Sequence, residues 1–137
     1  MLRPEDFLGL WRLERIIDDR LSGMAGRFEG TARLVPQGDG LLYREEGMLR
    51  LGEGTPLVAH RSYLWRWEGD AVAVSFTDGR PFHRFRPAGI AAGTDHPCGA
   101  DLYRVLYDFA AFPRWTAQWD VAGPRKAYRM VSVYGPP

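Results

Sequence analysis

Two arginines, one glutamate and several tyrosines fall at alternate positions within segments that have the pattern of β-strands. Because successive side chains of a strand point to opposite faces, those that share a face with large apolar residues are expected to point inward. Guanidinium groups bind carboxylates and phosphates bidentately, so inward arginines indicate a site for an anionic group. The residues that we expect to form this ligand site are Arg15, Tyr43, Glu45, Arg61, Tyr63, His83, Tyr103 and Trp119.

The same residues allow a second interpretation, which is a network of side chains that satisfy one another. A buried charge is costly unless it is paired or hydrogen-bonded. Glu45 and Arg61 fall on strands that we expect to be neighbours, so they can pair across them, with tyrosine hydroxyls completing the hydrogen bonds. We favour the ligand interpretation because Arg15 and Arg61 face a single glutamate, which leaves one cation unmatched.

A second group of reactive side chains lies in and beside the longest expected loop, residues 87–100. His96, Cys98 and Asp101 are close in sequence, and His83 could approach them in space. Their spacing matches no recognised zinc site and nothing indicates an activated thiol, so we assign no metal ligand and no catalytic residue. We expect Cys98 to be a small buried side chain. We expect this loop to cover one end of the strands, with His96 and Asp101 hydrogen-bonding the strand ends.

Short strands, separated by Gly and Pro residues, account for most of the chain. The expected strands are residues 11–17, 27–34, 41–51, 58–67, 71–77, 82–86, 102–109, 114–121 and 126–134. A short helical turn is expected at Pro4, before these strands. Short connections favour pairing in chain order, and closure removes exposed sheet edges. The sequence therefore predicts an all-β fold, a single antiparallel up-and-down β-barrel.

Length and composition restrict the class of protein. The 137 residues suit one domain, residues 1–137. The 18 Lys and Arg residues nearly balance the 17 Asp and Glu residues, which argues against a nucleic-acid or membrane partner. One cysteine allows no intrachain disulfide, and no run is apolar enough for a membrane helix. With no signal sequence, we expect a cytoplasmic location. Without a phosphate-binding loop, we expect no cofactor.

Two resemblances support the barrel. The motif Gly9-Leu10-Trp11 resembles the start of lipocalins and fatty-acid-binding proteins. That resemblance implies that Trp11 plugs the closed end and that a basic residue of the last strand, here Arg129, packs over it. Nearly the whole chain also resembles an uncharacterised family of bacterial lipocalin-like, calycin-type domains. The segments that carry this second resemblance are residues 9–18, 78–83, 96–103 and 119–126. It implies the fold and no activity.

The function that these observations favour is non-enzymatic binding of a small anionic or amphipathic molecule. Two alternatives stay open. An enzyme would use the same cavity, with His83 or His96 as general base. An interaction module would have a filled interior and would expose aromatic residues such as Phe112 or Tyr134 to a partner, including a second copy of the chain in a homodimer.

Overall fold

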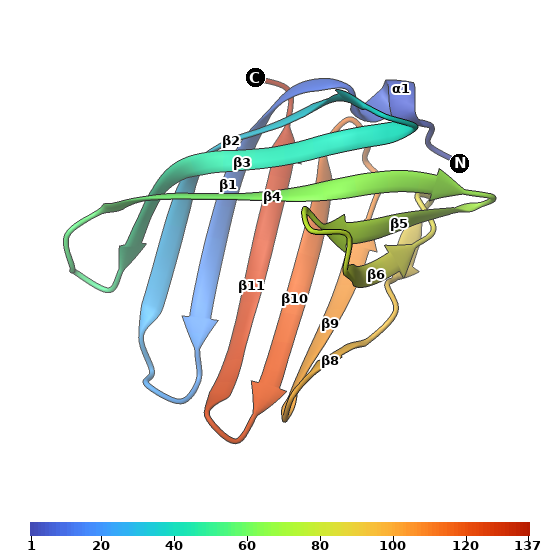
Figure 1. Cartoon of the computed structure of the whole chain (residues 1–137). Helices are drawn as coiled ribbons and strands as arrows, with labels where there is room; N and C mark the ends of the chain where they lie inside the picture. Colours follow the sequence, from blue (N-terminus) through green and yellow to red (C-terminus); the bar gives the residue numbers. More distant parts are fainter.

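Long alternating strands build an antiparallel sheet that curves into a nearly closed barrel (Figure 1). The structure is a computed structural model that describes residues 1–137. Its elements are α1 (Pro4–Phe7), β1 (Gly9–Asp19), β2 (Ala25–Gln37), β3 (Gly40–Leu51), β4 (Leu57–Glu68), β5 (Ala71–Phe76), β6 (Pro81–Phe85), β7 (Ile90–Ala92), β8 (His96–Cys98), β9 (Asp101–Asp108), β10 (Trp115–Gly123) and β11 (Lys126–Gly135). None of its helices has the length and apolar character needed to cross a membrane.

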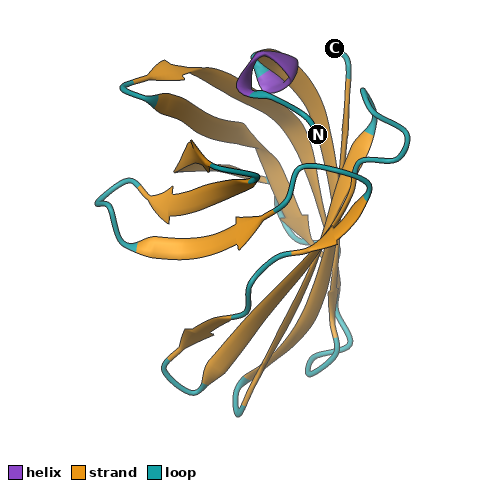
Figure 2. Cartoon of the chain, turned by 90° about the vertical axis from the view of Figure 1, so that its right-hand side faces the viewer, coloured by secondary structure: helices purple, strands orange, loops and turns teal.

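The strands follow one another round the barrel in chain order. The sheet path runs from β6 back through β5, β4, β3 and β2 to β1, and β1 also pairs with β11, the last strand. From β11 the path continues through β10 and β9 to β7, with β8 also paired to β9. Figure 2 shows how strongly the sheet curves, with α1 at one end. The up-and-down barrel and the N-terminal helical turn expected from the sequence are therefore confirmed.

The segment expected to be one irregular loop, residues 87–100, instead contains two short strands, β7 and β8, which both pair with β9. Between them, the N–H of Gly93 donates to the carbonyl oxygen of Val105 (3.0 Å) and the N–H of Thr94 to that of Arg84 (2.9 Å). Val105 lies on β9 and Arg84 lies on β6. Residues 93 and 94 therefore bridge the two end regions of the sheet path and help to close the barrel. Three-residue strands are too short to show the alternation that identifies a strand in sequence.

Aromatic residues close the end of the barrel near α1. Phe7 has no exposed surface. The carbonyl oxygen of Phe7 accepts a hydrogen bond from the indole Nε1 of Trp11 (2.9 Å). Phe112, expected to be exposed, packs its ring against those of Phe7 (5.6 Å) and Trp11 (5.6 Å). The expectation that Arg129 packs over Trp11 is wrong. Arg129 lies on the outer face of β11, where it forms an ion pair with Asp120 (2.7 Å).

Two facing glycines bring β2 and β3 unusually close. Gly30 and Gly47 are register partners on the inner face, and a Cβ on either would overlap the backbone of the other strand. No side chain therefore fits at this pair, which is a typical reason for glycine within a strand. The inner face is left open there, between the positions of Arg15 on β1 and Glu45 on β3.

Candidate functional site

A cavity of about 320 Å³ lies inside the barrel. All eight site residues expected from the sequence line it, from six strands, and their role in binding stays a prediction. The alternative of a filled interior is wrong. Space is left partly because Ala117, between two tryptophans on the inner face of β10, is the register partner of Ser132 on β11. Two small side chains thus meet where large ones would fill the barrel.

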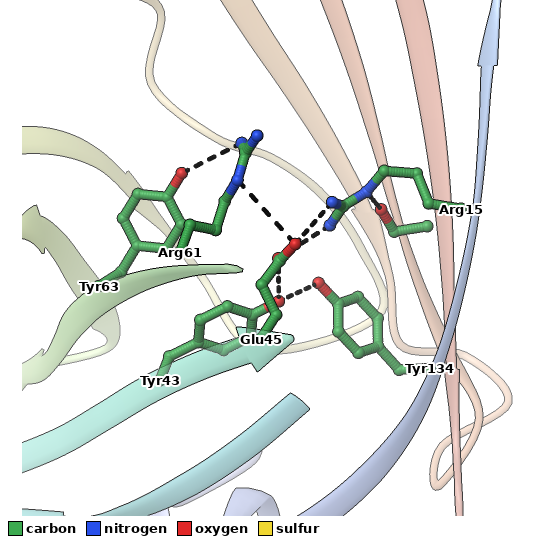
Figure 3. Close-up of polar contacts among 7 residues, drawn as sticks. Arg15, Tyr43, Glu45, Arg61, Tyr63 and Tyr134 are labelled. Atoms are coloured by element: carbon green, nitrogen blue, oxygen red, sulfur yellow. Dashed lines mark hydrogen bonds and ion pairs between the residues drawn. The ribbon is translucent and has the colours of Figure 1, made fainter. Parts of the chain in front are cut away.

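Arg15 and Glu45 form a buried ion pair in the cavity wall (Figure 3). Arg15 donates from Nη1 and Nη2 to the two carboxylate oxygens of Glu45 (2.7 and 2.9 Å) and from Nε to Oγ of Ser132 (2.7 Å). The hydroxyl of Tyr43 donates to Oε1 of Glu45 (2.7 Å). Its single proton is thereby used, so Tyr134, 2.7 Å away, donates to Tyr43. The network has no net charge, and each of its side chains hydrogen-bonds to another member of the network.

The surroundings keep this network in one protonation state. Burial by itself would lower the pKa of Arg15, but hydrogen bonding to Glu45 and its charge outweigh burial and raise it. Burial by itself would raise the pKa of Glu45, but hydrogen bonds from Arg15 and its charge lower it. Burial raises the pKa of Tyr43 well above its ordinary value and that of Tyr134 to about 12. Both phenols therefore remain donors at neutral pH.

Arg61 is the cavity cation without a close ionic partner. Its Nε lies 3.9 Å from Oε2 of Glu45, and its Nη1 lies 3.5 Å from the hydroxyl of Tyr63. The cross-strand pair expected between Glu45 and Arg61 is formed, since the two residues are register partners on β3 and β4, but it is long because Arg15 holds the carboxylate more closely. The side chain of Arg61 is 52% exposed, against 9% for Arg15. Arg61 thus marks the open side of the cavity, which we call the mouth.

Tyr134 was expected to be exposed, yet it is buried within the network. It shares the inner face of β11 with Tyr128 and Ser132, so strand alternation by itself indicates that Tyr134 points inward. Here Tyr134 is the register partner of both Leu13 and Trp115, which hold the end of β11 inside the sheet.

Aromatic rings form another part of the cavity wall. The ring of Phe82 stacks on those of Trp119, Phe76 and Tyr63, at centroid distances of 5.0, 4.8 and 5.5 Å. Tyr103 also lines the cavity, and its hydroxyl accepts a hydrogen bond from Nζ of Lys126 (3.2 Å). Such a wall suits the flat or apolar body of a ligand.

Beside the cavity, two of the three side chains in question, Cys98 and His96, differ from expectation. Cys98 is exposed, although it also lines the cavity. Asp101 forms an ion pair with Lys126 (3.4 Å), and His96 packs its ring against Phe82 (5.1 Å). The contact of Asp101 is with the first residue of β11, so it does reach a strand end as expected, whereas the expected hydrogen bond from His96 to a strand end is not formed. Nowhere do three His, Cys, Asp or Glu side chains come together as a metal ion would require.

His83 lines the cavity as a neutral side chain. Its Nε2 lies 2.8 Å from the hydroxyl of Tyr107. Burial, with a smaller contribution from the charge of His96, lowers the pKa of His83 to about 3. A histidine that takes up a proton only near pH 3 is a weak base at neutral pH, so its surroundings do not favour His83 as a general base.

Acidification is expected to destabilise the protein through His83. Its pKa is about 3 in the folded protein against 6.5 ordinarily, so the unfolded chain takes up the proton first. Stability is therefore lost as the pH falls from 6.5 towards 3, and this loss reaches about 2 kcal/mol at pH 5. Urea denaturation of wild type and His83→Phe at pH 7.5 and 5.0 measures it. Between the two pH values, His83→Phe should lose about 2 kcal/mol less unfolding free energy than wild type. Equal losses in the two proteins would contradict the low pKa of His83.

The nearly closed up-and-down barrel, its aromatic plug and its lined interior define a lipocalin-like protein. Within this class, the chain belongs to DUF6314, a family of unknown function whose model matches residues 7–136. The resemblance to an uncharacterised family of lipocalin-like barrels thus agrees with the family found. No curated protein matches the sequence.

Two solved structures share the fold. The S-type phycobiliprotein lyase CPES from Guillardia theta has 9% sequence identity and a TM-score of 0.61, with 95% of this chain and 86% of that chain covered. A protein of unknown function from the DUF3598 family of Nostoc punctiforme PCC 73102 has 13% identity and a TM-score of 0.62. The match covers 98% of this chain and 48% of that one, so this chain spans about half its length. At these identities the likeness shows the fold alone.

Proposed function

We propose that the protein binds a small amphipathic anion, with its oxyanion group at Arg61 and its apolar body against the aromatic wall. The observation that carries this proposal is the unmatched guanidinium of Arg61. The charged side chains that line the cavity, apart from its histidines, are Arg15, Glu45 and Arg61. Because Arg15 and Glu45 neutralise each other, one positive charge remains, at the mouth.

The electrostatics of Arg61 support this assignment. Burial by itself would lower its pKa, but the neighbouring Tyr63 and Glu45 outweigh burial and raise it, so the side chain stays charged. An oxyanion placed here would accept charge-assisted hydrogen bonds, which are stronger than neutral ones. One similar barrel belongs to a phycobiliprotein lyase, which supports the choice of fold and does not assign a lyase activity to this chain.

The test compares two dyes of similar shape, the anion 1-anilinonaphthalene-8-sulfonate and the uncharged N-phenyl-1-naphthylamine. Arg61→Met is expected to weaken binding of the anion about tenfold, since a half-exposed charge-assisted hydrogen bond lies at the low end of about 1.5–3 kcal/mol. Binding of the uncharged dye should change little. Fluorescence titration gives both dissociation constants.

A matched control lies on the same strand. Arg66 is on the outer face of β4, where it pairs with Glu68 (3.3 Å), so Arg66→Met should affect neither dye. Ala117→Leu, which fills the cavity, should weaken both dyes, with its folding checked by thermal denaturation. The proposal fails if Arg61→Met binds the anion as tightly as wild type does, or if Arg66→Met weakens it equally.

A further inference from the structure

Two buried side-chain polar atoms in this protein lack a hydrogen-bond partner, Nδ1 of His83 and Nε1 of Trp115. Both residues line the cavity, and they are only 5% and 1% exposed. Buried polar groups in folded proteins nearly always have a partner. That both exceptions occur around one cavity indicates that a bound molecule supplies what the protein lacks.

The hydrogen bond with Tyr107 decides which kind of group His83 offers. The Tyr107 hydroxyl has one hydrogen-bond partner, Nε2 of His83 (2.8 Å), and burial keeps the phenol protonated by raising its pKa. Its proton therefore has Nε2 as its acceptor, which leaves the proton of the neutral imidazole on Nδ1. Indole nitrogen is always a donor. Both unpartnered atoms are thus N–H donors.

We propose that the deeply buried part of the cavity binds an uncharged oxygen acceptor, a carbonyl or ether oxygen of the ligand, through Nδ1–H of His83. Trp115, whose Nε1–H is the other unpartnered donor, lines the same cavity. This inference rests on the proposed function, because it assigns a second group to the ligand held at Arg61. The ligand class becomes an amphipathic acid with a neutral oxygen function distant from its acidic group.

The acceptor is neutral because no free cation is available in the buried part. The charge of Arg15 is paired with the carboxylate of Glu45, and Arg61 lies at the exposed mouth. An oxyanion placed against two neutral N–H groups would be buried without a counter-charge, which is costly. A carbonyl oxygen accepts the same hydrogen bonds without that cost.

Four probes separate the two sites. Indane, 1-indanone, indane-5-carboxylate and 1-oxoindane-5-carboxylate differ only by a ketone and by a carboxylate. NMR titration of ¹⁵N-labelled protein gives the four dissociation constants. In wild type, each ketone is expected to bind about tenfold more tightly than its hydrocarbon counterpart, because it relieves an unpartnered buried donor. Each carboxylate should also bind more tightly than its uncharged counterpart.

The variants assign each preference to its residue. His83→Phe should abolish the ketone preference and keep the carboxylate preference, whereas Arg61→Met should do the reverse. His60→Phe, on the exposed outer side of β4, is the matched control and should change neither preference. If His83→Phe does not fold, Trp115→Phe replaces it and should also lower the ketone preference.

Equal binding of ketones and hydrocarbons by wild type would overturn the inference. So would an unchanged ketone preference in folded His83→Phe or, where that variant does not fold, in Trp115→Phe. Loss of the carboxylate preference alone would overturn the assignment of Arg61 and leave the inner site standing. Failure of all four probes to bind would count against both sites.

Discussion

Replacing Arg15 with methionine is expected to lower the free energy of unfolding by about 3–5 kcal/mol, because it leaves the charge of Glu45 buried without its partner. The side chain of Glu45 is almost fully buried, and the nearest other cation, Arg61, is 3.9 Å away and half-exposed. Urea denaturation at pH 7.5 measures the loss. Arg12, on the outer face of the same strand, is the matched control, and Arg12→Met should stay within about 0.5 kcal/mol of wild type.

A double variant shows where that energy comes from. In Arg15→Met/Glu45→Leu both charges are gone, and replacing a buried ion pair by apolar residues is often neutral. We expect the double variant to recover most of the stability that Arg15→Met loses. A double variant as unstable as Arg15→Met would mean that the guanidinium of Arg15 stabilises the fold through packing. Its Cζ lies 5.3 Å from the centroid of the Phe28 ring, which is one such contact. A loss below about 1 kcal/mol in Arg15→Met would contradict the buried-charge argument itself.

The sequence predicts which residues point inward, but it does not predict this pair. Alternation places Arg15, Glu45 and Arg61 on the inner face, and adjacency of strands suggests Glu45 with Arg61. In the structure β2 lies between β1 and β3, and Arg15 and Glu45 align with Phe28 and Ala32 of β2. They meet diagonally across β2, past a glycine that has no side chain to intervene. Such a reach depends on sheet curvature and side-chain length, which alternation does not encode.

The cavity itself shows the same limit. Residues that line it could be predicted because the face of a strand on which a side chain lies follows from its position in the alternating sequence. That it is hollow depends on two small residues, Ala117 and Ser132, being register partners on neighbouring strands, and register is set by turns and by closure of the whole sheet. The unpartnered nitrogen of His83 could not be predicted either, because it depends on how its ring is placed beside Tyr107.

Replacing Phe7 with alanine is expected to cost about 3–5 kcal/mol of unfolding free energy, the range for truncating a fully buried aromatic side chain. Phe7 is the residue through which α1 packs into the barrel. It is surrounded by aromatic rings at centroid distances between 5.3 and 5.9 Å. These rings belong to Trp65, Trp67, Phe109, Phe112 and Trp115. Thermal and urea denaturation measure the loss, with Leu8→Ala as the control, since Leu8 is exposed.

Phe7 does not line the cavity, whereas Arg61 lines it at the mouth. The plug and the ligand site should therefore be separable. While it remains folded, Phe7→Ala should bind 1-anilinonaphthalene-8-sulfonate within about threefold of wild type, because no contact of a mouth-bound anion is removed. Arg61→Met should do the opposite, losing the anion while keeping its stability, because a half-exposed charge contributes little to folding. If folded Phe7→Ala is less stable and also fails to bind the dye, the aromatic packing around Phe7 maintains the geometry of the ligand site. The prediction that stability and binding can be separated would then be wrong.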